Sequence, residues 1–178
     1  TMNKKLNIGV ISCSIMAQLH MKAVIDHPNA ELYMICDINE ALLNETAAKY
    51  NINRKTTDYR QMLADPAVDA VIIVTPDQTH REISVAALEA GKHVLCEKPM
   101  ALTLDDCKAM IDAAAKAKTK MMVGQICRYT PGFVAAKKLI EHGEIGELFF
   151  VETEYAHDYA HIDVEWRLDP LRRGFLGG

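Results

Sequence analysis

The run of residues 69–74 restricts the possible folds of this chain more than any other feature. After Asp69 it is continuously apolar, with the sequence Ala-Val-Ile-Ile-Val, and most of its side chains are β-branched. A strand that is apolar on both faces must be buried on both faces, as happens in a parallel sheet between two layers of helices. The run therefore predicts a central strand of an α/β protein.

The residues on either side of this run alternate between short strands and helices. Strand patterns appear near residues 6–11, 32–36, 54–57, 92–96 and 120–124, and helix patterns near residues 15–27, 39–50, 58–64, 79–90 and 103–118. Strands that alternate with helices of this length imply right-handed crossovers between parallel strands. We therefore expect a doubly wound parallel Rossmann sheet.

The pattern changes near residue 125. Pro131 begins a helix that runs to about residue 142, and residues 148–155 form the next strand pattern. One helix and one strand cannot enclose a hydrophobic core. We therefore divide the chain into a first domain, residues 1–125, and an incomplete second α/β domain, residues 126–178.

Charge and cysteine usage argue against several classes of partner. The 178 residues carry a formal net charge of −4 and contain no basic run, which argues against a nucleic acid or an anionic membrane. No uninterrupted apolar stretch approaches the length of a membrane span. The cysteines are odd in number and form no Cys-x-x-Cys pair, which predicts reduced thiols and a cytoplasmic protein. They are Cys13, Cys36, Cys96, Cys107 and Cys127.

Residues 12–17 form the turn where dinucleotide-binding folds have the pattern G-x-G-x-x-G/A. Here the turn reads Ser-Cys-Ser-Ile-Met-Ala, so only the final small residue is kept. Two interpretations of Ser14 remain open. Its side chain crowds the place of a pyrophosphate, at a cost of about 1–2 kcal/mol if φ is positive there, or its hydroxyl caps the helix. The candidate cofactor-binding residues of this turn are Ser12, Ser14, Ile15 and Met16.

Asp37 ends the second strand, roughly 20 residues beyond this turn. A carboxylate in that position accepts hydrogen bonds from the ribose diol of an adenosine. The next two residues, Ile38 and Asn39, offer no cation for a 2′-phosphate. Asp37 is therefore predicted to bind NAD in preference to NADP, although an isolated Asp at a strand end is also a common turn former.

The strand near residues 92–96 ends on Glu97-Lys98-Pro99. Pro99 has no N–H group to continue a strand ladder, so the strand must end there. Ligands of parallel α/β sheets bind beyond the carboxyl ends of the strands. The Lys98 ammonium is thus predicted to lie where a reacting oxygen would sit, and a solvated lysine is the alternative interpretation of this tripeptide taken alone.

In combination, these motifs resemble the Gfo/Idh/MocA oxidoreductases. The resemblance implies an N-terminal Rossmann domain that binds the dinucleotide and a C-terminal α/β domain for substrate binding and oligomerisation. Members of this family oxidise or reduce sugars, inositols and related polyols with NAD(P). The residues that carry the resemblance are Asp37, Thr75-Pro76 with His80, Glu97-Lys98-Pro99, Arg128-Tyr129 and Trp166-Arg167.

The resemblance implies roles for individual residues. Lys98 is the expected catalytic lysine, which would hydrogen-bond the substrate oxygen during hydride transfer. Glu97 is expected to orient Lys98 and to hold the nicotinamide end of the cofactor, and the Lys98–Pro99 peptide bond is expected to be cis. Thr75, Pro76 and His80 would line the nicotinamide half of the cleft.

The substrate pocket is expected to be bordered by Lys98, Arg128, Trp166 and Arg167. In the family, a Gly-rich stretch like Gly177-Gly178 precedes an Asp/His motif that transfers the proton, and the present sequence ends before such a motif. The resemblance therefore implies an incomplete enzyme without activity of its own. The alternative is a non-catalytic Rossmann module that binds a nucleotide or a protein partner.

Two further expectations concern assembly and metals. The apolar residues 148–151 lack partner strands, which predicts a homo-oligomer, most simply a two-fold dimer that pairs this strand with its copy. His20 and His27 are placed on or near the first helix, remote from the cleft. Residues 157–163 contain two His and two Asp, but no helix defines their spacing, so no metal site is expected.

Overall fold

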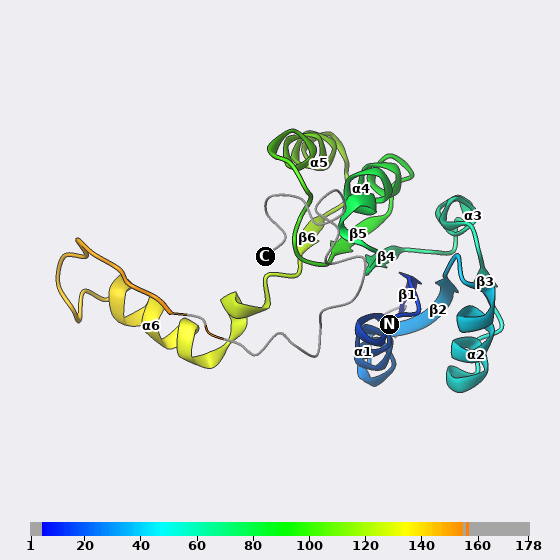
Figure 1. Cartoon of the computed structure of the whole chain (residues 1–178), viewed down its shortest axis with the longest axis horizontal. Helices are drawn as coiled ribbons and strands as arrows, with labels where there is room; N and C mark the ends of the chain where they lie inside the picture. Colours follow the sequence, from blue (N-terminus) through cyan, green and yellow to red (C-terminus); the bar gives the residue numbers. More distant parts are fainter. Residues whose placement is uncertain (1–4, 155, 157–178) are drawn as a thin grey trace. The chain divides into compact units, whose positions relative to one another are not determined.

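The computed structural model describes residues 5–154 and 156. Within them, one compact unit ends at Gly124 and a second begins at Gln125. The first unit is built on a six-stranded sheet whose order is β3-β2-β1-β4-β5-β6 (Figure 1). All neighbouring strands pair in parallel. The strands are β1 (Leu6–Ile11), β2 (Ala30–Cys36), β3 (Lys55–Thr56), β4 (Ala70–Ile73), β5 (His93–Cys96) and β6 (Met121–Val123).

This strand order confirms the doubly wound Rossmann sheet. The order in which strands are added to the sheet reverses between β1 and β4. The strands β2 and β3 lie on one side of β1, whereas β4, β5 and β6 lie on the other. In open parallel sheets, such a switch point opens a crevice at the carboxyl ends of the strands, where ligands bind.

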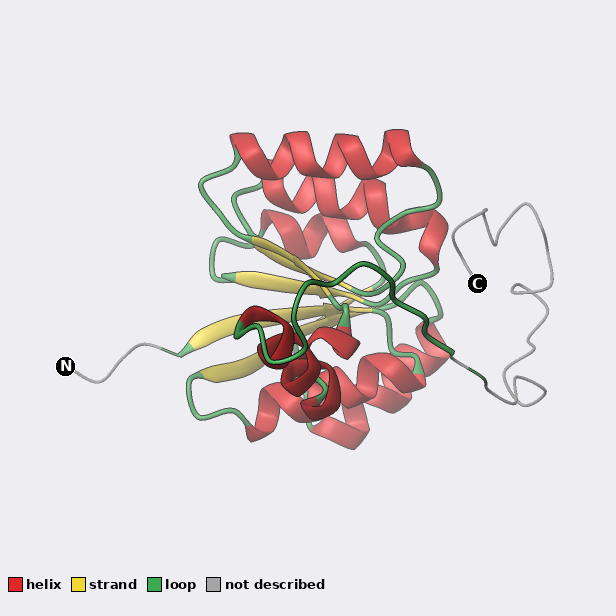
Figure 2. Cartoon of the chain, turned by 90° about the vertical axis from the view of Figure 1, so that its left-hand side faces the viewer, coloured by secondary structure: helices red, strands yellow, loops and turns green. Residues whose placement is uncertain are grey.

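Helices cover both faces of the sheet (Figure 2). One core cluster joins β-strand side chains to α1 (Ile15–Asp26) and α2 (Glu40–Tyr50). The other joins them to α3 (Tyr59–Ala64), α4 (His80–Glu89) and α5 (Leu104–Lys116). The central run is shared between the two, with Val71 and Ile73 in one cluster and Ile72 and Val74 in the other. The predicted burial of this strand on both faces is therefore confirmed.

The helix starts follow from local side-chain chemistry. A polar side chain before each first turn accepts a hydrogen bond from a backbone N–H that has no partner inside the helix. Ser14, Asn39, Asp58 and Thr103 cap α1, α2, α3 and α5 in this way. By contrast, α4 has no side-chain cap and follows a short 3-10 turn, η1 (Asp77–Thr79).

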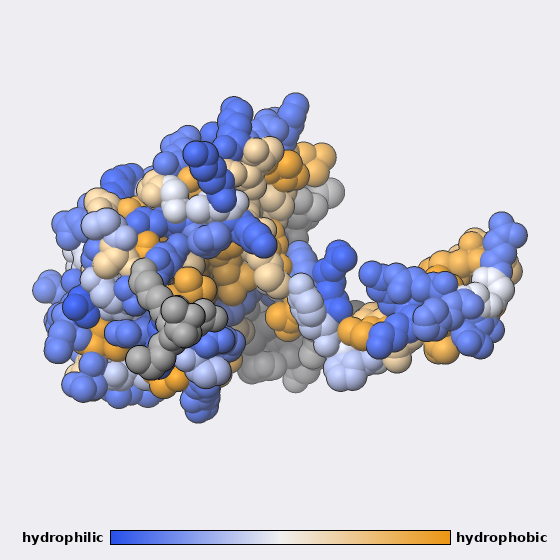
Figure 3. Space-filling view, turned by 180° about the vertical axis from the view of Figure 1, so that it is seen from behind, coloured by the Kyte–Doolittle hydropathy of each residue, from blue (hydrophilic) through white to orange (hydrophobic). Residues whose placement is uncertain are grey.

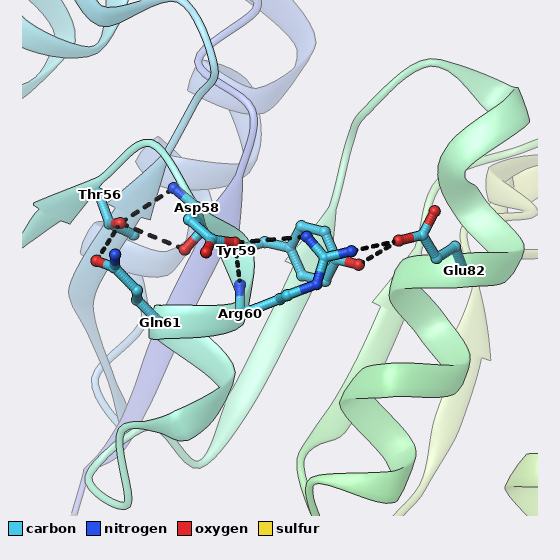
Figure 4. A network of polar contacts seen from close by, with 6 residues as sticks. All are labelled: Thr56, Asp58, Tyr59, Arg60, Gln61 and Glu82. Atoms are coloured by element: carbon cyan, nitrogen blue, oxygen red, sulfur yellow. Dashed lines mark hydrogen bonds and ion pairs between the residues drawn. The ribbon is translucent and has the colours of Figure 1, made fainter.

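A polar network joins α3 to α4 at the surface (Figure 4). The Tyr59 hydroxyl donates to the Glu82 carboxylate, and Arg60 Nη2 lies 2.9 Å from the same oxygen. Partial burial, followed by the Glu82 carboxylate, raises the pKa of Tyr59 to about 12. Because Arg60 and Glu82 are exposed, this network orients the two helices and contributes little to stability.

The second unit contains η2 (Ile126–Tyr129) and α6 (Pro131–Glu141), and none of its described side chains is buried. The strand predicted at residues 148–155 is wrong for the described residues 148–154, which form no strand. A strand needs a hydrogen-bonding neighbour, and the described part of this unit offers none. Phe149 is 96% exposed, and Figure 3 shows apolar side chains at the surface of the second unit. Among the described residues, no helix has the length and apolar character needed to cross a membrane.

Candidate functional site

The turn after β1 adopts a different conformation from the one considered for Ser14. Ser14 has φ of −58°, whereas Ser12 has φ of 108°. Ser14 therefore does not have the positive φ considered above. The positive φ belongs to Ser12 instead. The N–H of Ser12 donates to the carbonyl of Cys36 at 2.7 Å, which ties the turn to the end of β2.

Most backbone donors of this turn are already engaged. The N–H of Ser14 donates to the Ser12 hydroxyl at 3.1 Å, and the N–H of Ala17 donates to the Ser14 hydroxyl at 3.4 Å. The capping interpretation of Ser14 is therefore confirmed. Ile15 and Met16 have first-turn N–H groups without a hydrogen-bond partner among the described residues. Both residues are exposed, so these two N–H groups, at the positive end of α1, remain open to an anion.

Asp37 lies directly beside this turn. Its Oδ2 accepts the N–H of Cys13 at 2.7 Å, and its Oδ1 accepts the N–H of Asn39 at 2.8 Å. A carboxylate oxygen can accept a second hydrogen bond, so this partly exposed carboxylate still has capacity for a diol. The next side chain, Ile38, is 91% exposed and apolar, and no lysine or arginine contacts Asp37 within the described residues.

Glu97 is held at the end of β5 by contacts from two directions. Its N–H donates to the Ile73 carbonyl at 2.9 Å, and its carboxylate accepts the N–H of Lys98 at 2.9 Å through Oε2. Its other oxygen, Oε1, lies 2.8 Å from Nε2 of His20. This hydrogen bond is the main reason that the pKa of Glu97 lies below its ordinary value, with smaller contributions from Lys98 and in opposition to partial burial.

The contact with Glu97 corrects the expectation that His20 is remote from the cleft. His20 comes three residues after Ala17 and four before Val24, which are both buried on α1. This helical spacing places His20 next to the buried face. The spacing was visible in the sequence, but it could not identify Glu97, 77 residues away, as the partner.

Lys98 follows as an exposed residue, and its peptide bond to Pro99 is cis, as expected. The Lys98 ammonium forms no hydrogen bond or ion pair with any of the described residues. Its backbone N–H is held by Glu97, so the ammonium at the end of its side chain can donate hydrogen bonds to a ligand oxygen.

Thr75 and Pro76 follow β4, and the Thr79 hydroxyl lies 2.7 Å from the Thr75 hydroxyl. His80 differs from its expected role in lining the cleft, because it is only 1% exposed. Its Nδ1 lies 2.8 Å from the Pro99 carbonyl oxygen, and its Nε2 lies 2.8 Å from that of Thr75. His80 therefore links the segments after β4 and β5, and each of its ring nitrogens lies within hydrogen-bond distance of a backbone carbonyl oxygen.

The strand ends of one sheet edge thus carry an open helix N-terminus, a carboxylate suited to a diol and an anchored lysine. Residues 6–125 match the family model described as an oxidoreductase family with an NAD-binding Rossmann fold, Gfo/Idh/MocA. The chain belongs to the Gfo/Idh/MocA family.

Individual relatives of the Gfo/Idh/MocA family cover most of this chain. It is 35% identical over 175 residues to levoglucosan dehydrogenase from Pseudarthrobacter phenanthrenivorans, an alignment that spans 92% of this chain and 45% of the relative. It is 34% identical over 153 residues to inositol 2-dehydrogenase from Salmonella typhimurium, which spans 84% of this chain and 46% of the relative. The chain therefore spans less than half the length of these curated relatives.

Solved structures agree with this assignment. A levoglucosan dehydrogenase in complex with NADH and levoglucosan is 37% identical, with a TM-score of 0.76, over 80% of this chain and 41% of that chain. The WlbA dehydrogenase from Bordetella pertussis, in complex with NADH and UDP-GlcNAcA, is 32% identical with a TM-score of 0.76, over 80% of this chain and 44% of that chain.

Some predicted site residues lie outside the first unit or outside the described residues. Arg128 is an exposed residue of η2 in the second unit. Trp166 and Arg167 lie outside the described residues, as do residues 157–163. Within residues 5–154 and 156, no group of three or more His, Cys, Asp or Glu side chains could hold a metal ion.

The cysteines are free thiols. Cys13, Cys36 and Cys96 are buried near the carboxyl ends of β1, β2 and β5. Burial is the main cause that raises the pKa of Cys13 to about 11 and the pKa values of Cys36 and Cys96 to about 12. None of these three thiols is suited to act as a nucleophile at neutral pH.

Proposed function

We propose that this chain binds NAD(H) across the carboxyl edge of its sheet. The open N–H groups of Ile15 and Met16 suit a pyrophosphate, since an anion is favoured at a helix N-terminus. The Asp37 carboxylate suits the adenosine ribose, and its negative charge disfavours the 2′-phosphate of NADP. These residues fit the cofactor despite the missing glycines, because the Ser14 hydroxyl occupies only the N–H of Ala17.

We further propose that the chain supplies the cofactor-binding half of a dehydrogenase that acts on a sugar, inositol or related polyol. Bound NAD would supply the hydride acceptor for the carbon that carries the reacting hydroxyl. The Lys98 ammonium would hydrogen-bond that oxygen and stabilise the negative charge that develops on it during hydride transfer. Glu97 holds Lys98, and Thr75 and Pro76 flank the nicotinamide half of the site. Arg128, Trp166 and Arg167 remain proposed substrate contacts.

The observation that carries this proposal is the ammonium of Lys98, which has no partner among the described residues and follows β5 at the same sheet edge as Asp37. Calorimetric titration of the 178-residue chain with NADH and NADPH tests it. We expect NADH to bind and NADPH to bind more weakly. No binding of either nucleotide would favour the alternative, a non-catalytic module that recognises a protein partner.

Absence of turnover by the 178-residue chain stays a prediction. It is checked by following NADH formation from NAD with myo-inositol and with levoglucosan. Detectable NADH formation would contradict it, and the variant Lys98→Met would then be expected to lose that activity while still binding NADH.

The homo-oligomer and the cytoplasmic location also stay predictions. The exposed apolar side chains of residues 148–151 support self-association, although these residues form no strand in the described structure. Light scattering on the full chain measures the oligomeric state directly, and a monomeric mass would contradict the expected dimer.

A further inference from the structure

The carboxylate of Glu97 is enclosed by groups from three parts of the chain: α1, the segment after β5 and the segment after β6. His20 of α1 contacts Oε1 at 2.8 Å, and the backbone N–H of Lys98 donates to Oε2 at 2.9 Å. Gly124 follows β6, and a side-chain carbon built onto it would lie 3.4 Å from Oε1. The Glu97 side chain is only 14% exposed and that of His20 21%. A carboxylate in this setting has very little rotational freedom.

The direction of the hydrogen bond between His20 and Glu97 follows from the chemistry of the two groups. An ionised carboxylate only accepts hydrogen bonds, whereas a neutral imidazole has one donor and one acceptor nitrogen. Nε2 of His20 must therefore carry a proton and donate it to Oε1. This interaction ties the first helix to the end of β5 across 77 residues of sequence.

We propose that His20 is a positioning residue that acts on Lys98 through Glu97. The imidazole holds one carboxylate oxygen, and the other oxygen then holds the backbone N–H of Lys98. His20 itself touches neither the cofactor nor the reacting oxygen in this arrangement. The inference deepens the proposed function and rests on it, because Lys98 is the group that His20 ultimately places.

The charged and titratable groups that face Glu97 within the described residues are few. They are His20 on α1 and the neighbouring Lys98, whereas Gly124, just after β6, brings no side chain. The hydrogen bond from His20 is also the largest contribution to the lowered pKa of Glu97. Removing the imidazole should therefore change the titration of Glu97 in a way that loss of simple packing would not.

The first test uses the unaltered chain. Nitrogen-15 chemical shifts of the His20 ring at neutral pH distinguish protonated from unprotonated Nε2. We expect Nε2 to be protonated, and we expect the amide proton of Lys98 to titrate together with the Glu97 carboxyl carbon. An unprotonated Nε2 would overturn the inference, and this measurement requires no variant that might fail to fold.

The second test compares His20→Leu, which removes the donor, with His20→Gln, which keeps an N–H donor on a side chain of similar reach. In His20→Leu, the titration midpoint of Glu97 should rise toward its ordinary value, and the amide proton of Lys98 should follow that shifted midpoint. His20→Gln should return the midpoint toward that of the unaltered chain. The matched control His27→Leu changes an exposed histidine just after α1 and should leave the midpoint unchanged.

The outcomes separate the inference from the proposed function. An unchanged Glu97 midpoint in folded His20→Leu would overturn the positioning role of His20, whatever the nucleotide affinity. Failure of the unaltered chain to bind NADH would overturn the proposed function, and the His20 ring nitrogen shifts and the Glu97 titration would still decide the inference.

Discussion

Replacement of Asp37 should separate its structural role from its role in nucleotide binding. The Asp37→Ala variant removes the acceptor of two backbone N–H groups, those of Cys13 and Asn39. Cys13 is completely buried, whereas Asn39 is exposed and can donate to water instead. An unsatisfied buried donor costs about 1–3 kcal/mol, so we expect the free energy of unfolding to fall by about 2 kcal/mol. For a chain of this length that corresponds to a decrease in Tm of about 4–8 °C.

The Asp37→Asn variant provides an intermediate case. Its amide oxygen can accept one of the two N–H groups, but the amide nitrogen cannot accept the other. We therefore expect a loss of stability of about 1 kcal/mol, roughly that of one hydrogen bond. The affinity for NADH should fall about tenfold in both variants, because both lose the charged acceptor for the ribose diol. The preference for NADH over NADPH should shrink as well.

Thermal unfolding and NADH titration of the same protein preparations measure the two effects. The control Asp26→Asn changes an exposed carboxylate on α1 that lies 3.0 Å from Lys22. An exposed ion pair of this kind contributes little to stability, so the free energy of unfolding should hardly change. Unchanged stability in Asp37→Ala would refute the argument from the buried Cys13 donor. Unchanged NADH affinity would refute the assignment of Asp37 to the ribose.

Three further predictions concern stability, pH and thiol chemistry. Lys92 is 6% exposed and donates hydrogen bonds to two backbone carbonyls at 2.7 and 2.9 Å. The variant Lys92→Met should therefore lower the free energy of unfolding by about 2–4 kcal/mol. Urea unfolding measures this loss against the control Lys118→Met, which changes an exposed lysine. The ionised Glu97, whose pKa is lowered in the folded chain, should contribute stability that is present above its ordinary value of 4.5 and lost as pH falls through the lowered value. Glu97→Gln should remove that part of the acid dependence in a pH series of unfolding curves. The three buried thiols, with pKa values raised to about 11–12, should alkylate much more slowly at pH 8 than exposed Cys127, as followed by mass spectrometry.

Several elements of the fold were predictable because their causes are local. The apolar run at residues 69–74 required cover on both faces, and Val71 and Ile72 indeed face different core clusters. Asn39 and Asp58 cap helices by reaching N–H groups only two or three residues away. The strand expected at residues 148–155 failed for the complementary reason, since a strand depends on a neighbour that the described residues do not supply.

The candidate site also has features that follow from the local sequence and features that depend on tertiary contacts. From the sequence alone, the strand-end positions of Asp37 and Lys98 followed from the alternation of strands and helices, because parallel strands bring their carboxyl ends to one edge. Only the tertiary structure decided that His80 is buried against Thr75 and Pro99, that His20 reaches Glu97 and that Asp37 holds Cys13. These contacts join residues on different elements, and their geometry depends on how helices pack across the sheet, which neither composition nor local periodicity specifies.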